Sequence, residues 1–259
     1  DDFLTRRAHA YQAYYEHMPL RLFSKPVGHR MKLYRRSSFG RLAEFAVLDT
    51  RQYRTDQPCG DKTGPACAGV SDPQATLLGN EQERWLNRTL KRSQATWNVL
   101  AQQIMMAAAD RSQTEERAVS MDQWSGYEVP RRRLMQFLAD ERIANPVVLT
   151  GDIHSNWVND LKIDFARPEG KTVATEFVGT SISSNGDGVQ SDDAVRAVLA
   201  KNPFVRFHNR ERGYVSCTLT AKEWRADYQV VEKVSTPDSP KITRSSWTVA
   251  AGRPGAEKA

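Results

Sequence analysis

Asp152 and His154 are the residues whose types and spacing first suggest chemistry. They follow a short apolar, β-branched run, Pro146 to Thr150, which is typical of a strand buried on both faces, and Gly151 stands where that strand must turn. In open α/β sheets, ligands bind outside the carboxyl ends of the strands, where both side chains would lie. Their i, i+2 spacing would point both side chains the same way if the turn stays extended.

A carboxylate and a neutral imidazole offer oxygen and nitrogen, which suit a hard or borderline metal ion. The same residues also fit a structural turn, in which Asp152 accepts backbone N–H bonds and His154 is a satisfied interior histidine. Asn156 and Trp157 favour the metal site, because they would place a polar amide and an apolar wall beside the pair.

Arg51 is a second candidate, at the end of another predicted strand. The run Leu42 to Asp49 becomes wholly apolar toward its end and delivers Arg51 just beyond it. A guanidinium group at such a point can bind a phosphate through two parallel hydrogen bonds. It can equally pair with Asp49 or another carboxylate and fix the following loop. The sequence leaves both roles open.

The elements that would position these residues alternate between strands and helices and end in a run of antiparallel strands. This order predicts an α/β layer architecture. Predicted helices cover Asp2 to Met18, a segment from Asn80 with Glu83 in a capping box, Arg131 to Arg142, and Gln190 to Lys201; predicted strands cover Met31 to Arg36, Arg41 to Asp49, Thr96 to Met106, Pro146 to Thr150, Thr172 to Gly179, Gly213 to Thr220, Trp224 to Val234, and Ile242 to Val249.

The composition permits one sizeable domain or two small ones, since the chain has 259 residues of which 39% are hydrophobic. It contains no apolar run long enough to cross a membrane, which takes about 18 residues or more. The net charge of +6 is a mild attraction for anionic partners. The basic cluster Arg131 to Arg133 alternates with leucines at helical spacing, so it is typical of a solvated helix face, and we expect no specific nucleic-acid binding.

The long loop Thr55 to Gly79 contains two of the three cysteines, Cys59 and Cys67. A disulfide that closes this short Gly- and Pro-containing segment is sterically possible and would indicate an oxidising compartment. A metal site is the alternative, but the pair lacks C-x-x-C spacing and a second pair. Cys217 lies in an alternating run and fits a buried small hydrophobe. In Asp122 to Tyr127, two aromatic residues could wall a cleft or pack in the core.

Five blocks together give a resemblance to a known family. They are GDIHSNW (Gly151 to Trp157), LYRRSSFGRLAEFAVLDTRQYR (Leu33 to Arg54), the segment Leu77 to Ala107, DQWSGY (Asp122 to Tyr127) and VATEFVGTSISSNGDG (Val173 to Gly188). The chain resembles the carboxyl half of the PhoD family of alkaline phosphatases and phosphodiesterases. Upstream blocks of that family, with Ser-Cys-Gln, Gly-Asp-x-x-Tyr and Asp-Asp-His-Glu patterns, would precede residue 1.

The resemblance implies a fold and a set of site residues. The fold would be the C-terminal half of a metallophosphatase-like four-layer αββα sandwich, with residues 1–259 forming one domain whose amino-terminal part is missing. The family hydrolyses phosphate esters at an iron and calcium centre, so Asp152 and His154 would be metal ligands. Gln102 stands where the wider superfamily has a ligand histidine; it would be a weak ligand better suited to calcium than zinc, a hydrogen-bond donor to a ligand, or a core amide. Export to the periplasm or the exterior is also implied.

Two functions follow from this reading. The chain is either part of a longer phosphate-ester hydrolase or a non-catalytic module that binds phosphate or a partner through the same cleft. Because it would supply only about half of the metal ligands, we expect residues 1–259 alone to show little or no phosphatase activity.

Overall fold

The computed structural model describes residues 2–167 and 169–259, and the chain divides into two compact units, 1–35 and 36–259. The smaller unit contains helix α1 (Phe3–His17) and a short 3-10 helix, η1 (Leu22–Ser24). Asp2 caps α1, because its side chain accepts a hydrogen bond from the backbone N–H of Leu4. The predicted helix is therefore confirmed, although none of its residues is buried.

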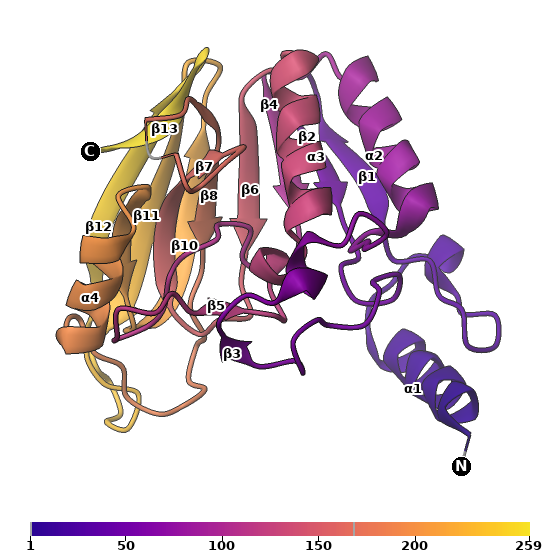
Figure 1. The fold of residues 1–259 in the computed structure, drawn as a ribbon, viewed down its shortest axis with the longest axis horizontal. Coiled ribbons are helices and arrows are strands. Elements are labelled where there is room, and N and C mark those ends of the chain that lie inside the picture. Colours follow the sequence, from indigo (N-terminus) through magenta and orange to yellow (C-terminus); the bar gives the residue numbers. More distant parts are fainter. Residues whose placement is uncertain (1, 168) are drawn as a thin grey trace. The chain divides into compact units, whose positions relative to one another are not determined.

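A seven-stranded mixed sheet forms the centre of the larger unit, in the order β1-β2-β4-β6-β8-β7-β9 (Figure 1). Strands β2, β4, β6 and β8 are parallel neighbours, whereas β7 is antiparallel to β8 and β9. The predicted central strand is confirmed as β6, whose Val147 and Val148 are fully buried on opposite faces. The strands are β1 (Arg35–Phe39), β2 (Ala43–Val47), β4 (Trp97–Ala101), β6 (Pro146–Thr150), β7 (Asn156–Lys162), β8 (Thr172–Val178) and β9 (Val205–Asn209).

A second, four-stranded antiparallel sheet follows in the order β10-β11-β12-β13. Its first three strands lie where the alternating sequence predicts them. Strands β7, β9 and β13 were not predicted, because each contains polar or turn-forming residues that break the apolar pattern. The strands are β10 (Arg212–Leu219), β11 (Glu223–Val231), β12 (Lys241–Ala250) and β13 (Arg253–Lys258).

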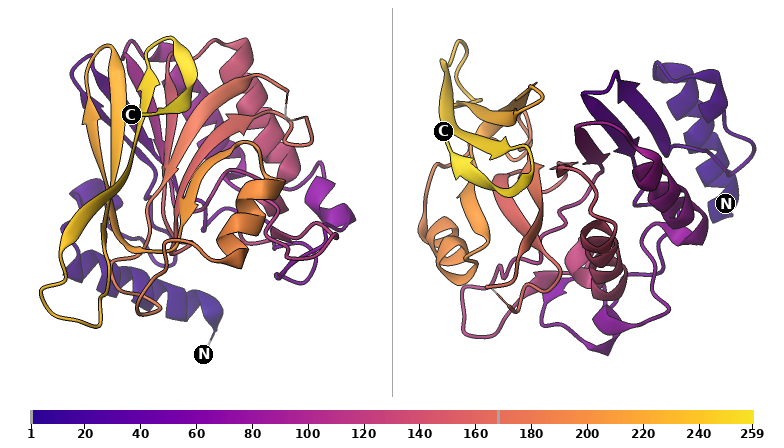
Figure 2. Two further views of the ribbon diagram at one scale, coloured as in Figure 1. Left: turned by 90° about the vertical axis from the view of Figure 1, so that its left-hand side faces the viewer. Right: turned by 90° about the horizontal axis from the view of Figure 1, so that it is seen from above.

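The larger unit is built in three layers. Helices α2 (Gly79–Arg92), α3 (Glu128–Asp140) and α4 (Asp193–Lys201) share one apolar core with the seven-stranded sheet. The opposite face of that sheet packs on the four-stranded sheet, where Trp97 and Trp224 meet edge to face with ring centroids 5.8 Å apart. Figure 2 shows these layers from two further sides. This α/β/β arrangement is the one expected for half of an αββα sandwich.

Some predicted boundaries were wrong. Helix α2 begins at Gly79 without a capping box, and the carboxylate of Glu83 instead forms an ion pair with Arg133 of α3. Helix α3 begins at Glu128, so Pro130 lies within its first turn, where a missing N–H is tolerated. Strand β4 ends at Ala101, short of the predicted Met106; beyond it, the side-chain amides of Gln102 and Gln103 donate to Thr150 of β6 and to the carbonyl oxygen of Leu48 after β2.

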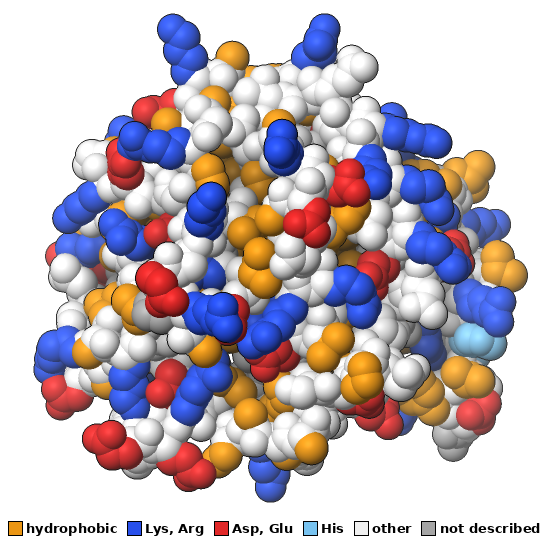
Figure 3. Space-filling view, turned by 45° about the horizontal axis from the view of Figure 1, so that its top comes forward, with side chains coloured by type: hydrophobic (Ala, Val, Ile, Leu, Met, Phe, Trp, Pro, Cys, Tyr) orange, Lys and Arg blue, Asp and Glu red, His pale blue; other side chains and the backbone are white. Residues whose placement is uncertain are grey.

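Within the long loop between β2 and α2, a disulfide joins Cys59 and Cys67, whose Cα atoms are 5.7 Å apart, so of the two roles that the sequence left open the structure contains the disulfide. A short strand in this loop, β3 (Thr63–Gly64), pairs with β5 (Val119–Ser120). On the face drawn in Figure 3, lysine and arginine side chains are interspersed with acidic ones. Within residues 2–167 and 169–259, every helix is too short or too polar to span a lipid bilayer.

Candidate active site

Three parallel strands, β2, β4 and β6, bring polar side chains to the same edge of the sheet. Asp49 and Arg51 follow β2, Gln102 follows β4, and Asp152 and His154 follow β6. The carboxyl ends of neighbouring parallel strands lie at one edge, so residues far apart in the sequence meet there. This edge is the candidate active site.

The carboxylate of Asp152 is held by two side chains. Its Oδ1 accepts a hydrogen bond from Nη2 of Arg51 at 3.1 Å, and its Oδ2 accepts one from Nε2 of Gln123 at 3.0 Å. Nη1 of Arg51 donates to Oδ1 of Asp122 at 2.6 Å, so this guanidinium group bridges two carboxylates. The side chains of Arg51 and Asp152 are 37% and 35% exposed, which leaves both accessible to a ligand.

Asp122 is the anchor of this network. Its Oδ1 also accepts hydrogen bonds from Nη1 of Arg54 at 2.8 Å and Nε2 of Gln57 at 2.9 Å. Burial raises the pKa of Asp122, but hydrogen bonds and charges from Arg51 and Arg54 outweigh burial and hold the pKa below its ordinary value. Asp122 therefore stays ionised at neutral pH and keeps both guanidinium groups in place.

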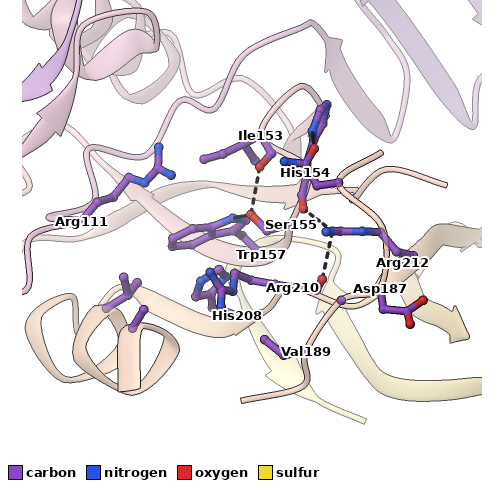
Figure 4. A pocket seen from close by; sticks show the side chains of 14 residues that line it. Arg111, Ile153, His154, Ser155, Trp157, Asp187, Val189, His208, Arg210 and Arg212 are labelled. Atoms are coloured by element: carbon purple, nitrogen blue, oxygen red, sulfur yellow. Dashed lines mark hydrogen bonds between the residues drawn. The ribbon is translucent and has the colours of Figure 1, made fainter. Parts of the chain in front are cut away.

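His154 faces a different partner. Its Nδ1 lies 2.9 Å from Oδ1 of Asn185, an acceptor, so in the neutral ring Nδ1 carries the proton and Nε2 has the lone pair. Arg212 supports the loop from below, because its Nη1 donates to the carbonyl oxygen of His154 at 2.8 Å (Figure 4). An imidazole oriented through Nδ1 is typical of a histidine that binds a metal through Nε2.

The turn after β6 is not extended. Asp152 and His154 have φ angles of 68° and 54°, so both adopt the left-handed conformation. The assumption of an extended turn was therefore wrong. Ile153, between them, packs against the core under the helices, and this fixes the loop while the two polar side chains turn to Arg51 and Asn185.

Gln102 and Asp49 have structural contacts. The amide of Gln102 donates to Oγ1 of Thr150 at 2.9 Å and accepts from Nε1 of Trp124 at 3.0 Å, which favours the core-amide role over a ligand role. Asp49 accepts from the backbone N–H groups of Arg51 and Gln52, each at 3.0 Å, and so fixes the turn after β2. The guanidinium group of Arg51 thus pairs with other carboxylates.

The aromatic residues of the site region are mostly core. Trp124 and Tyr127 are 1% and 0% exposed, so they do not wall a cleft. Asn156 is also buried and accepts a hydrogen bond from the backbone N–H of Thr180 at 3.2 Å. Trp157 is the exception: together with His154 it lines a cavity of about 420 Å³.

Comparisons with known proteins place this chain in a family. A family model described as PhoD-like phosphatase matches residues 1–228. The chain belongs to the PhoD-like phosphatase family. It is 46% identical over 256 residues to alkaline phosphatase D of Bacillus subtilis (strain 168), which covers 99% of this chain and 44% of that protein. A solved structure described as "Structure of PhoD" superimposes with a TM-score of 0.95 at 46% identity, covering 99% of this chain and 49% of that one.

The resemblance to the PhoD family and the mixed α/β fold are thereby confirmed. The chain spans about half the length of these PhoD-like relatives. Within the part of the chain that the structure describes, no three His, Cys, Asp or Glu side chains lie close enough together to hold a metal ion.

Sequence reasoning missed several residues of this candidate site. Asp122 and Gln123 lie in the DQWSGY block, but the aromatic residues of that block drew the interpretation away from its polar ones. Asn185 lies in the small-residue loop after β8, within the block Val173 to Gly188, from which no site residue was predicted. Asp122, Gln123 and Asn185 are polar residues in loops that follow strands, and this position in the sequence was the available signal.

Proposed function

We propose that this chain supplies part of the active site of a metal-dependent phosphate-ester hydrolase, an alkaline phosphatase or phosphodiesterase. The observation that carries the proposal is the contact of Asp152 with Arg51 at the carboxyl ends of β6 and β2, in a member of the PhoD-like phosphatase family. The carboxylate, with an imidazole nitrogen two residues away, can bind metal, and the guanidinium group beside it can bind phosphate.

In this proposal, the carboxylate of Asp152 and Nε2 of His154 bind metal. Their oxygen and nitrogen donors fit the iron and calcium expected from the family resemblance. Bound metal ions would polarise the phosphoryl oxygens and supply the nucleophile. Asn185 keeps the His154 ring in the tautomer that leaves Nε2 free, and Gln123 restrains the Asp152 carboxylate.

Arg51 would act on the substrate. Its guanidinium group is fixed by Asp122 and reaches the candidate ligand Asp152, so a phosphoryl oxygen at that position would also be within its reach. A pre-positioned cation stabilises negative charge without reorganisation during the reaction. The contact with Asp122 keeps Arg51 in place when Asp152 turns to a metal ion.

Substitution of the two ligand candidates tests the proposal. In the complete enzyme, Asp152→Asn and His154→Ala should each lower phosphate-ester hydrolysis by roughly 100-fold or more and reduce bound metal, while the fold is kept. Asp193→Asn and His9→Ala are matched controls at exposed positions on α4 and α1 and should change neither quantity. Near-normal turnover and metal content in either ligand variant would refute the assignment.

We also propose that the protein is exported, as the family resemblance implies. The disulfide between Cys59 and Cys67 supports this, because such bonds form and persist in oxidising compartments. Fractionation of producing cells, followed by detection of the protein, tests it: recovery only from the cytosol would contradict export.

A further inference from the structure

The cavity beside His154 extends beyond the residues that the proposed chemistry uses. It has a volume of about 420 Å³, within the range of about 300–1,000 Å³ that small-molecule sites occupy. Its wall runs from the loop after β6 across β9 to the start of β10. Figure 4 shows Arg111 on one side of Trp157 and Arg212 on the other, with His208 stacked beneath Trp157.

Arg212 is a buried cation without a carboxylate partner among the described residues. Only 6% of it is exposed, and its Nε donates to the carbonyl oxygen of Gly186 at 2.9 Å. Its Nη1 donates to the carbonyl oxygens of His154 and Arg210 at 2.8 and 3.0 Å, whereas Nη2 donates to none of the described residues. Burial of a charge without an opposite charge is unfavourable, so an anion at this guanidinium group would stabilise it.

Two further arginines add positive charge to the same wall. The guanidinium group of Arg111 forms no ion pair with any described residue, and Arg210 is paired with Asp192. Arg210 and Arg212 are close enough to influence one another: burial lowers the pKa of Arg212, and the charge of Arg210 lowers it further. The wall is therefore a place where positive charge accumulates.

The carboxylate that lines the cavity does not neutralise these cations. Asp187 is already bound, because its Oδ1 accepts from the backbone N–H groups of Val234 and Ser235 at 2.7 and 2.9 Å and its Oδ2 accepts from the hydroxyl of Ser235. The lining thus contains three guanidinium groups and a single carboxylate whose oxygens face other donors.

We propose that this cavity binds a second phosphate group of the substrate, next to the phosphoryl group that reacts. The proposal rests on the proposed function, because His154 belongs both to the candidate metal centre and to the cavity wall. The preferred substrates are accordingly phosphate esters that carry another phosphate a short linker away. Arg111 binds that group on one side of Trp157, and Arg212 on the other side adds positive charge to the same wall.

Paired substrates test this selectivity in the complete enzyme. The p-nitrophenyl ester of thymidine 5′-phosphate and the same ester with an added 3′-phosphate differ only in the second phosphate. We expect kcat/KM to be about 10-fold higher for the bisphosphate, and Arg111→Gln to abolish this preference through KM. Arg196→Gln is the matched control, since it removes a positive charge from exposed α4 outside the cavity and should keep the preference. Equal kcat/KM for the two substrates in the wild type, or a preference retained by Arg111→Gln, would overturn the proposal.

A binding measurement separates this proposal from the proposed function. Calorimetry with inorganic pyrophosphate, in buffer containing EDTA, should show binding to the wild type and to Arg196→Gln but at least about 10-fold weaker binding to Arg111→Gln. If this pattern appears while Asp152→Asn keeps normal turnover, the cavity is an anion site and the proposed metal centre is wrong. Equal pyrophosphate affinity in wild type and Arg111→Gln overturns the cavity proposal and leaves the metal centre untouched.

Inorganic phosphate released by the enzyme is another source of the same anion. Inhibition by inorganic phosphate distinguishes the two sources. If the cavity serves only free phosphate, Arg111→Gln will relieve that inhibition without altering the preference between the paired substrates, and the assignment to the substrate is overturned. Loss of the preference supports it.

Discussion

Arg51 is the residue on which the charges of the candidate site converge. It lies between the carboxylates of Asp122 and Asp152, and its place was predicted from the apolar run before it, while its partners were not. Asp122 is 71 positions away in sequence. Asp122 follows β5, and only tertiary folding brings it beside Arg51, so no local pattern could have predicted the pair.

Arg51→Ala should impair use of anionic substrate more than it destabilises the fold. Half-exposed ion pairs contribute only about 0–1 kcal/mol to stability, whereas a charged hydrogen bond to phosphate contributes more. We expect kcat/KM to fall by at least about 10-fold with a small change in Tm. Arg54→Ala, which also loses a contact to Asp122, should lower kcat/KM less. A large fall in Tm with unchanged kinetics of the folded fraction would assign Arg51 a structural role.

Glu176 on β8 is a buried carboxylate that the chemistry does not use. It is 0% exposed, and burial raises its pKa. Four donors face its oxygens: the backbone N–H groups at 106 and 107, the hydroxyl of Thr150 and the amide of Asn159. Through these hydrogen bonds, the carboxylate connects β6, β7, β8 and the loop after β4.

Glu176→Gln should destabilise the protein although it removes a buried charge. The NH2 group of the new amide would replace an oxygen that accepts two hydrogen bonds. Two buried donors would then lack an acceptor, which costs about 2–3 kcal/mol. Urea unfolding would measure this loss, with Glu116→Gln at an exposed position as the control. An unchanged unfolding free energy would show that the buried charge itself, and not its hydrogen bonds, dominates at this position.

At the scale of elements, β9 makes the fold sensitive to pH through His208. Its ring stacks on Trp157 of β7 at a centroid distance of 3.6 Å, and Nδ1 donates to the carbonyl oxygen of Asn156 at 3.1 Å. Burial, with the nearby charges of Arg111 and Arg210, lowers the pKa of His208 from 6.5 to about 4. The folded chain thus favours the neutral ring.

The stability linked to His208 is fully present above pH 6.5, the ordinary pKa, and is lost as pH falls toward about 4. The difference amounts to about 3 kcal/mol. His208→Phe should keep the stacking and remove this pH dependence. The gap in unfolding free energy, wild type minus variant, should therefore decrease from pH 7 to pH 4.5. A constant gap over that range would contradict the shifted pKa.

The sequence predicted elements where apolar pattern and burial coincide. β6, β8 and the strands β10 to β12 have such patterns, and the structure contains them. β7 has Asn159 and Asp160 at its centre. These polar residues are tolerated because Asn159 donates to the buried Glu176 and Asp160 accepts from the backbone N–H of Ala256. The candidate site shows the same limit: Asp152, His154 and Arg51 follow predicted strands, whereas Asn185 and Asp122 are recognised only through tertiary contacts.

At the scale of the whole molecule, the chain spans about half the length of its PhoD-like relatives. Residues 1–259 alone should therefore show little or no phosphatase activity, at least about 100-fold below that of the complete enzyme. A two-metal site needs several fixed ligands for each ion, and Asp152 and His154 are the two that we propose here. Assays of both proteins on p-nitrophenyl phosphate and its bis-ester, with iron and calcium supplied, measure the difference. Comparable activity of the shorter chain would contradict the expectation.

The left-handed backbone at Asp152 and His154 sets stability against activity in this loop. Residues with a Cβ atom pay about 1 kcal/mol or more in that conformation, and glycine adopts it freely. Glycine at 152 or 154 would relax the backbone and remove the side chain that we propose to bind metal. Selection for thermostability alone would therefore favour glycine at these two positions, although the proposed metal ligands would be lost. A search for more thermostable variants of this protein should keep both residues unchanged.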